Sequence, residues 1–469
     1  MIEFILNHSL INLDDFQADT TLLDYLRLDR GLVGSKEGCA SGDCGACTVV
    51  IASIADDKKS LEYKSLNSCI CLLGTLHGKQ VITVEGLKNN QETLHPVQQA
   101  MVDKHGSQCG FCTPGFVMSL FAMSKDYQKK DRNEIVKNID GNLCRCTGYR
   151  PIIDAAQAVL DVPYSDSFDE QSDETIRRLK SIETSDSTSF YIPELISSFS
   201  KYYLQQPQAR LVAGGTDLVL DVTQGLKSLD KVIYIANVKE LKAIDLNEDE
   251  LIIGAAATYE ECADVLIKQY PALETHLDRL GSVQIRNVGT IGGNIANASP
   301  IGDMPPVLMA LDAQLSLQKG DVVRQVSIDD FYTGYKQTVL QQAEFIRDIR
   351  LPKSQPNHFL HVYKISKRYA DDISAICVAF NIQLTEEKKI VSCRIAMGGM
   401  AATVLRAQNC EKILLNQPLN SITLANAQAE ILTDYEPLDD VRASREYRLL
   451  MAQNLLHRLF IDLGADINE

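Results

Sequence analysis

Apolar residues in the first part of the chain come in short runs separated by polar turns. Runs over residues 2–6, 47–53 and 80–85 predict strands, because each is short and bounded by polar residues or glycine. A cluster of leucines between the first two runs predicts a short helix that begins at Thr20 or Thr21. The pattern therefore predicts a small domain of strands and one helix over residues 1–87.

Residues 88–162 have apolar side chains three or four positions apart, which is the period of amphipathic helices. Pro96 starts the first of four predicted helices. Asp131 and Glu134 form a capping-box pattern at the start of the third. Each helix has one apolar stripe, so the segment predicts a small four-helix domain.

The composition and the hydrophobic pattern change again along the rest of the chain, which divides it into three further segments. Residues 163–187 are polar and acidic and predict a solvated linker. Residues 188–353 alternate short apolar runs with two glycine-rich loops and predict one domain. Residues 354–469 combine strand-like runs over 373–382 and 390–397 with helices near 423–433 and 443–463 and predict a small α+β domain. A length of 469 residues agrees with three or four domains, and the fold class is multidomain α+β.

Composition narrows the class of protein. The net charge of −16 disfavours nucleic acid as a partner, because phosphates require basic patches. No run of about 18 apolar residues occurs, so no membrane span is expected, and the N-terminus lacks the features of a signal peptide. Thirteen cysteines without a signal peptide indicate a reducing, cytoplasmic compartment. Four of them stand alone in apolar surroundings and are expected to be core residues: Cys262, Cys377, Cys393 and Cys410.

The first set of closely spaced cysteines lies ahead of the second predicted strand. Cys39, Cys44 and Cys47 have the Cys-x4-Cys-x2-Cys spacing of plant-type ferredoxins, and Cys69 supplies a fourth thiolate. Neighbouring glycines allow the backbone to approach the sulfur atoms. The alternative is a zinc site. Cys71 is expected to point elsewhere and is left out.

A second set flanks the predicted helices. Cys109 and Cys112 form a Cys-x2-Cys pair, and Cys144 and Cys146 form a Cys-x-Cys pair. Each pair lies just before a predicted helix start, where free N–H groups favour a negative centre. A cluster held by four thiolates is such a centre. A four-cysteine zinc site is the alternative, although Cys-x-Cys is tight for zinc.

The two glycine-rich loops span residues 211–218 and 284–303. Neither has the Gly-x-Gly-x-x-Gly pattern, so a Rossmann dinucleotide site is not expected. Both can hold a pyrophosphate by backbone N–H groups. A lone glycine loop is more often a turn, but two in one domain after two cysteine sets favour a cofactor site.

These motifs together resemble the molybdenum hydroxylases, and the domain order is similar to that of the iron–sulfur and FAD subunits of bacterial xanthine dehydrogenases. The resemblance implies a β-grasp ferredoxin-like domain, a four-helix cluster domain, a vanillyl-alcohol-oxidase-like FAD domain and a C-terminal flavoprotein domain. Eukaryotic relatives continue into a molybdenum-binding domain. This chain ends at Glu469, so we expect the molybdenum cofactor on a partner subunit and no catalytic residue here.

The resemblance assigns residues one by one. It implies one 2Fe–2S cluster held by Cys39, Cys44, Cys47 and Cys69, and another held by Cys109, Cys112, Cys144 and Cys146. The residues expected to contact FAD are Leu211, Val212, Ala213, Gly214, Gly215, Thr216, Asp217, Leu218, Thr290, Gly293, Asn294, Asp303 and Lys364. Gln108 matches a glutamine that faces the pterin. Near the nicotinamide site Arg368 matches the family pattern, whereas Tyr369 and Ala370 depart from it.

The implied function is electron transfer. Electrons would pass from the partner's molybdenum centre through both clusters to FAD and on to NAD+, with oxidation of hypoxanthine and xanthine to urate as the overall reaction. The resemblance also implies a heterotetramer with two copies of each subunit. One alternative is the same role with an aldehyde or N-heterocycle as substrate. Another is a non-catalytic iron–sulfur protein that senses redox state or binds a partner.

Overall fold

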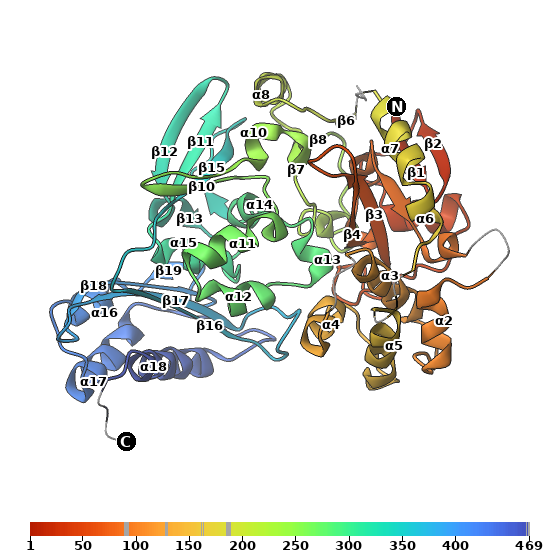
Figure 1. Ribbon diagram of the computed structural model, residues 1–469. Coiled ribbons are helices and arrows are strands. Elements are labelled where there is room, and N and C mark those ends of the chain that lie inside the picture. The colour runs from red at the N-terminus through yellow and green to blue at the C-terminus, as the bar shows by residue number, and fades with distance from the viewer. Residues whose placement is uncertain are drawn as a thin grey trace. The chain divides into compact units, whose positions relative to one another are not determined.

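The chain divides into two structural units, shown in the computed structural model of Figure 1. The first comprises Met1–Glu194, Gln208–Asn237 and Gly281–Gly289, and the second comprises Leu195–Pro207, Val238–Leu280 and Thr290–Glu469. The structure describes residues 1–88, 93–126, 130–160, 162, 164–183, 189–465 and 467. The C-terminal residues beyond 467 therefore lie outside it.

The first unit begins with a mixed five-stranded sheet in the order β2-β1-β5-β3-β4. Its strands are β1 (Ile2–Leu6), β2 (Ser9–Leu13), β3 (Thr48–Ile54), β4 (Leu61–Asn67) and β5 (Gln80–Ile82). β1 and β5 run parallel, and the other pairs are antiparallel. One face packs against α1 (Leu22–Asp24) and the π turn Tyr25–Asp29, whose apolar residues join the strands in one core. The 3-10 turns Ser68–Ile70 and Leu73–Leu76 lie between β4 and β5, and a third, Val84–Leu87, follows β5.

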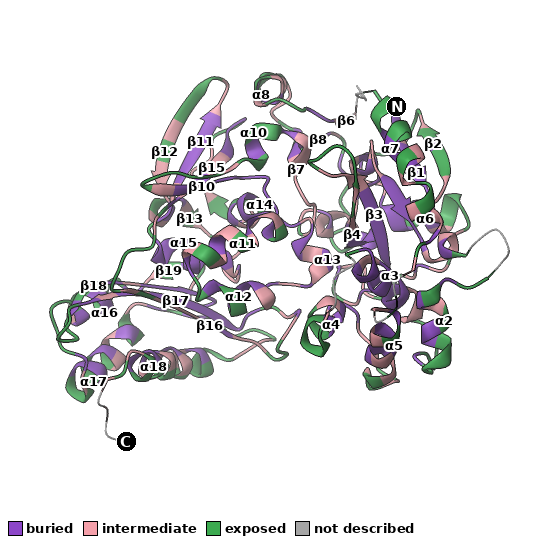
Figure 2. Cartoon of the chain, in the orientation of Figure 1, coloured by how far each residue is buried: buried purple, intermediate pink, exposed green. Residues whose placement is uncertain are grey.

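Four helices follow: α2 (Pro96–Asp103), α3 (Thr113–Ser124), α4 (Arg132–Ile139) and α5 (Arg150–Leu160). Asp131 and Glu134 make both hydrogen bonds of the predicted capping box. Helix α3 is the most apolar of the four and is buried over most of its length (Figure 2). The predicted four-helix domain is therefore present, with α3 as its central helix.

The segment 163–187 differs from the predicted solvated linker. Its described part forms α6 (Ser167–Glu170) and α7 (Ser172–Ser181). Phe168 is 2% exposed and packs with the helical domain, and Ile176 and Leu179 are buried as well. These three apolar residues bury one face of the two helices. The acidic composition of the segment as a whole gave no indication of this.

A small parallel sheet completes the first unit. Its order is β6-β8-β7, with β6 at Phe190–Tyr191, β7 at Arg210–Val212 and β8 at Val232–Tyr234. The strands share a core with the cysteine loop of the first domain. Three short helical segments belong here: α9 (Leu220–Thr223), the 3-10 turn Ile235–Asn237 and α13 (Val283–Arg286).

The second unit holds two larger antiparallel sheets and a two-stranded hairpin. The first has the order β12-β11-β15-β10-β9. Its strands are β9 (Ile244–Leu246), β10 (Glu250–Gly254), β11 (Gln314–Lys319), β12 (Val322–Ser327) and β15 (Phe345–Pro352). The surrounding elements are α8 (Ile196–Gln205), α10 (Lys239–Lys242), α11 (Tyr259–Gln269), α12 (Leu273–Asp278), α14 (Ile291–Ala296), α15 (Met304–Ala310), the turn Ile328–Asp330 and the hairpin β13–β14 (Tyr332–Gly334, Gln337–Thr338).

The second sheet of this unit has the order β16-β17-β18-β19. Its strands are β16 (His358–Ile365), β17 (Ile376–Leu384), β18 (Ile390–Gly398) and β19 (Leu405–Arg406). α16 (Gln408–Leu414), α17 (Ser421–Glu430), the 3-10 turn Ile431–Thr433 and α18 (Arg445–Asp462) share an apolar core with its strands.

The predicted multidomain α+β class is confirmed: a mixed five-stranded sheet and a four-helix domain precede two further domains that combine sheets and helices. The four solitary cysteines are buried, as predicted: Cys262, Cys377, Cys393 and Cys410. Among the described residues, no helix is both long and apolar enough to span a bilayer.

Candidate functional site

The first cysteine set forms one contiguous group of sulfur atoms. The Sγ atoms of Cys47 and Cys69 lie 3.3 Å apart, and both residues are buried. The Cys39 thiol hydrogen-bonds with Cys44 and Cys69, and these bonds hold the pKa of Cys39 well below its usual range. The spacing in the sequence and the position of Cys69 after β4 thus bring all four predicted ligands together.

Backbone donors point at this group. The N–H groups of Ser41 and Cys44 each donate to Cys39 Sγ over 3.4 Å. Gly42 has φ +83° and Gly45 has φ +67°, conformations that side chains resist. The loop is therefore shaped to turn N–H groups toward negative sulfur, as an iron–sulfur cluster requires.

The second cysteine set pairs its thiols across two loops. Cys109 hydrogen-bonds with Cys146, and both are exposed. Cys112 hydrogen-bonds with Cys144, and burial is the main reason why the pKa of Cys112 rises to about 12. The Thr147 N–H donates to Cys144 Sγ over 3.4 Å. As predicted, each pair lies just before a helix, α3 for the first and α5 for the second.

The arrangement of thiols bears on the choice between zinc and iron. In the first set the contacts run from Cys44 through Cys39 and Cys69 to Cys47, and in the second set they form two pairs. Four cysteine thiolates are the ligand set of a 2Fe–2S cluster, so both donor sets fit this group.

The two sets are joined through the backbone. The N–H of Leu143, next to Cys144, donates a 3.0 Å hydrogen bond to the carbonyl oxygen of Cys44. On the other side of the first set, Gln224 donates to the carbonyl oxygens of Cys39 and Ala40 over 3.1 and 3.2 Å. Gln224 directly follows α9, which comes just after the first glycine-rich loop.

The first glycine-rich loop packs against the chain that leads into the second. A Cβ atom on Gly214 would lie 1.9 Å from the carbonyl oxygen of Val288, so only glycine fits there. Gly215 has φ +74°. Gly214 thus lies backbone to backbone against Val288 and Gly289, which is the close approach that a phosphate-holding loop needs.

The remainder of the second loop belongs to the second unit. Thr290 caps α14, where its hydroxyl oxygen accepts the Gly293 N–H over 3.0 Å. Asn294 Oδ1 is buried and has no hydrogen-bond partner within the described residues. A buried acceptor without a donor is costly unless a ligand satisfies it, so Asn294 fits its predicted role in a cofactor site.

Asp303 and Lys364, both predicted FAD contacts, form an ion pair with each other over 2.7 Å. The Lys364 side chain is buried, and its ammonium also donates to the Arg279 carbonyl oxygen over 2.8 Å. Arg279 in turn donates to the carbonyl oxygen of Tyr369 and lies under the Tyr369 ring, 4.6 Å from its centre. Sequence reasoning missed Arg279, which no motif distinguishes from a solvated arginine.

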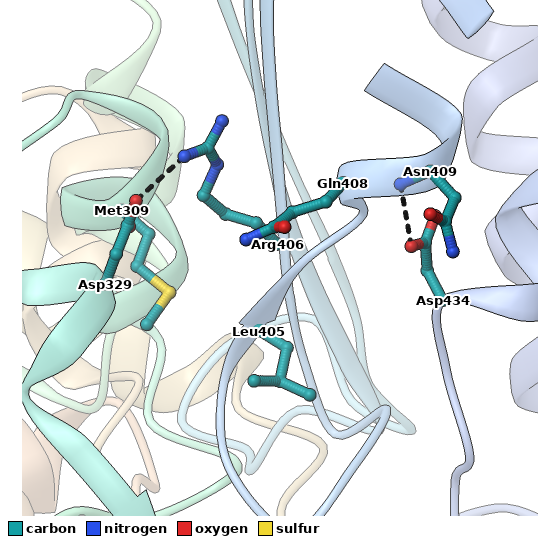
Figure 3. A pocket seen from close by; sticks show the side chains of 7 residues that line it. All are labelled: Met309, Asp329, Leu405, Arg406, Gln408, Asn409 and Asp434. Atoms are coloured by element: carbon teal, nitrogen blue, oxygen red, sulfur yellow. Dashed lines mark hydrogen bonds and ion pairs between the residues drawn. The ribbon is translucent and has the colours of Figure 1, made fainter. Parts of the chain in front are cut away.

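A cavity of about 290 Å³ lies in the C-terminal part of the second unit (Figure 3). Its charged groups are already paired: Arg406 binds Asp329 and Glu411, and Asp434 accepts the Asn409 N–H. None of the predicted cofactor residues lines it. The cavity therefore does not belong to the candidate site.

Family models match the chain along most of its length. The model for a 2Fe-2S iron–sulfur cluster binding domain matches residues 10–74, and that for a [2Fe-2S] binding domain matches residues 83–157. The FAD binding domain in molybdopterin dehydrogenase matches residues 184–354. The CO dehydrogenase flavoprotein C-terminal domain matches residues 361–463.

Similar proteins agree with these matches. A xanthine dehydrogenase from Emericella nidulans is 32% identical over 99% of this chain, which spans only 39% of that protein's length. The structure of reconstituted CO dehydrogenase from Oligotropha carboxidovorans is similar with a TM-score of 0.55 and 27% identity, over 59% of this chain and 97% of that one. A carbon monoxide dehydrogenase from Hydrogenophaga pseudoflava, 24% identical over 59% of this chain and 96% of that one, shares the fold with a TM-score of 0.55.

The domains and the two cysteine sets define an iron–sulfur flavoprotein with two 2Fe–2S domains and one FAD domain. The chain belongs to the molybdenum hydroxylases, whose iron–sulfur and FAD part it represents.

Proposed function

We propose that this chain is the electron-transfer subunit of a molybdenum hydroxylase of the xanthine dehydrogenase type, and that it delivers electrons from a partner's molybdenum centre to NAD+. The proposed ligands are Cys109, Cys112, Cys144 and Cys146 for one 2Fe–2S cluster and Cys39, Cys44, Cys47 and Cys69 for the other. The proposed FAD contacts are the loop at residues 211–218, together with Thr290, Gly293, Asn294, Asp303 and Lys364. When bound, clusters exchange single electrons, whereas flavin exchanges one or two and reduces NAD+ by hydride transfer.

One observation carries this proposal: the hydrogen bond from the Leu143 N–H to the Cys44 carbonyl oxygen, 3.0 Å long. It links a residue next to a ligand of the second set with a ligand of the first set. Gln224 then links Cys39 to the segment that follows the first glycine-rich loop. These hydrogen bonds form one route from the helical domain, through the first cysteine set, to the segment that follows the first glycine-rich loop.

We infer the direction of electron flow along this route from the exposure of the cysteines in the two sets. Cys109 and Cys146 are exposed, and so are Gln108 and Phe111, whose side chain is 46% exposed. Cys47 and Cys69, by contrast, are buried. An exposed cysteine pair next to an exposed aromatic residue suits the docking of a partner. We place the molybdenum-binding subunit at this end, with Gln108 facing its pterin.

The substrate and the acceptor are proposed from relatives. Similar proteins are xanthine dehydrogenases, which favours hypoxanthine and xanthine as substrates of the assembled enzyme and urate as its product. The loop at residues 364–372, with Arg368, is the proposed NAD+ end. We further propose a cytoplasmic location, because twelve of the thirteen cysteines are proposed ligands or buried core residues, and a heterotetramer with two copies of each subunit.

The test begins with the purified full chain. We expect about four irons, two for each cluster, and one FAD that acid releases, since neither glycine-rich loop contains a His or Cys to bond flavin covalently. The chain should oxidise NADH with a dye as acceptor. Zinc in place of iron, or flavin retained in the acid pellet, would contradict the cofactor assignment. Absence of xanthine oxidation with a molybdenum subunit encoded beside this chain would contradict the substrate.

A further inference from the structure

We infer that Gln284 is a positioning residue: its buried amide fixes the distance between the two cysteine sets. Gln284 lies in α13 and is 0% exposed. Its Nε2 lies 3.1 Å from Asn142 Oδ1 and 3.3 Å from both Thr48 Oγ1 and Ser119 Oγ. The inference rests on the proposed electron-transfer function, because it concerns the route between the clusters.

The three partners leave Gln284 as the donor. The Thr48 hydroxyl donates to the Gly45 carbonyl oxygen over 2.6 Å, and the Ser119 hydroxyl donates to Asn142 Oδ1 over 2.6 Å. The Asn142 amide nitrogen donates to the Gly45 carbonyl oxygen over 3.1 Å. Each oxygen near Gln284 Nε2 can therefore only accept from it, and the two amide hydrogens are shared among the three oxygens, which fixes the orientation of the Gln284 amide.

Each partner belongs to a segment that holds a cluster ligand. Thr48 follows Cys47, Asn142 lies two residues before Cys144, and Ser119 lies in α3, which begins directly after Cys112. The network consequently ties both cysteine loops and one helix to a single side chain from a distant segment.

The backbone around this network has no free space. A Cβ atom on Gly45 would lie 2.2 Å from the Gly141 carbonyl oxygen, and one on Gly115 would lie 2.1 Å from the Gly45 carbonyl oxygen. A Cβ atom on Gly141 would lie 2.3 Å from Gln284 Oε1. These three glycines, one beside each cysteine stretch, bring the segments into direct backbone contact.

Loss of the Gln284 donor would disturb this contact. All three oxygens would lose a donor: Thr48 Oγ1 and Asn142 Oδ1 would each keep one other, whereas Ser119 Oγ would keep none among the described residues. Buried polar networks tolerate partial satisfaction poorly. The Leu143–Cys44 hydrogen bond lies next to the network, since Leu143 follows Asn142 and Cys44 precedes Gly45. Relaxation around the unsatisfied oxygens would thus lengthen the link between the two sets.

The experiment compares Gln284→Met with Gln80→Met in the full chain. Methionine keeps the length of the side chain but cannot donate. Gln80 is the matched control: it is also buried in the first unit, and its Oε1, like that of Gln284, has no partner within the described residues. Gln80 donates to the Asn7 carbonyl oxygen, away from either cysteine set.

The readouts are the magnetic interaction between the two reduced clusters in EPR spectra, the rate of electron redistribution from cluster to flavin after pulse reduction, and hydrogen exchange of the Leu143 amide. For Gln284→Met we expect a weaker interaction, faster exchange, and a rate about tenfold lower, within the 100-fold that a 1 Å misplacement can cost. Gln80→Met should match the wild type in all three.

Equal behaviour of Gln284→Met and the wild type, or the same losses in Gln80→Met, would overturn the inference. If Gln284→Met loses iron, the milder Ser119→Ala variant decides: an unchanged cluster interaction would reject the positioning role, and a weakened one would support it. A wild-type chain without two cluster signals would instead reject the proposed function, so the two failures are distinguishable.

Discussion

The ammonium of Lys125 lies 2.8 Å from the carboxylate of Asp166, and both side chains are buried. The pair joins α3 to the residue that caps α6. His95 hydrogen-bonds to the same carboxylate over 3.0 Å, and Lys125 also pairs with Asp169. The segment between the helical domain and the FAD domain is therefore anchored by buried charges rather than solvated.

The first prediction concerns this anchor. Asp166→Asn leaves the Lys125 charge buried with only Asp169, and breaking a buried pair costs about 3 kcal/mol. Native-state hydrogen exchange of α3 and α6 amides should therefore become roughly 100-fold faster. Glu174→Gln is the control, because Glu174 and Arg178 form an exposed pair that contributes little. Equal effects of both changes would argue against the anchor.

The second prediction is the pH dependence of the same anchor. Burial alone would raise the pKa of Asp166, but the His95 hydrogen bond and the Lys125 charge outweigh it and hold that pKa well below its usual range. A lowered folded-state pKa gives stability that is present above the unfolded value of about 3.9 and is lost as pH falls through the folded value. The exchange difference between wild type and Asp166→Asn should be constant from about pH 7 to 5 and shrink below about 4. A difference that stays constant to about pH 3 would contradict this.

The third prediction concerns the first glycine-rich loop, residues 211–218, which we propose contacts FAD. Gly214→Ala places a Cβ atom 1.9 Å from the Val288 carbonyl oxygen, so the two loops must separate. Overpacking of this kind costs about 1–3 kcal/mol, which corresponds to FAD binding weaker by roughly tenfold to a hundredfold. Gly334→Ala is the control, since its Cβ would meet only the flexible end of Gln337 at 3.2 Å or more. Flavin titration with iron content as reference measures the effect, and unchanged affinity in Gly214→Ala would exclude the loop from the site.

The fourth prediction separates the two cysteine sets. Cys144→Ser should remove about two irons and one EPR signal, and Cys47→Ser should remove the other signal. Cys71→Ser should keep all the iron, because the Cys71 thiol contacts the Thr75 hydroxyl instead of the cysteine group. Iron analysis and EPR spectra check each variant. Loss of iron in Cys71→Ser would show that the ligand set is wrong.

The fifth prediction tests the surface around Gln108, where we propose that the molybdenum-binding subunit docks. Gln108 is exposed beside Cys109, so Gln108→Ala should leave iron content and NADH-to-dye activity unchanged. Reduction driven by substrate in the assembled enzyme should become slower, since only that reaction uses the pterin end. Equal loss in both assays, or loss of iron, would reject a pterin-facing role for Gln108.

Local signals predicted much of this structure. The strand at residues 2–6 and the capping box of Asp131 and Glu134 agree with β1 and α4, because both depend on neighbouring residues alone. The cysteine spacing predicted which thiols meet, since a short loop leaves few arrangements. The first pair of the second cysteine set lies directly before α3, as the sequence predicted, with Cys112 as the N-cap of the helix.

Other features depend on residues far apart in the sequence and left no local signal. Segment 163–187 appeared solvated because acidic residues outnumber the few apolar ones, of which Phe168 and Leu179 are buried. Gln284 was part of a recognised glycine-rich loop, yet its partners Thr48 and Asn142 lie 236 and 142 positions away. The role of a buried polar residue such as Gln284 can be recognised only in the folded structure, where its hydrogen-bond partners lie next to it.

The distance between Thr48 and Gln284 along the chain also sets an order of assembly. The two residues are 236 positions apart, and ribosomes add about 5–20 residues per second, so Gln284 emerges roughly 10–50 seconds after Thr48. The second cysteine set ends at Cys146, so for about the last 7–28 seconds of that interval both cysteine loops exist without the side chain that closes their network. Iron and sulfide therefore have a period of open access to the nascent protein, which ends when α13 is synthesised and docks.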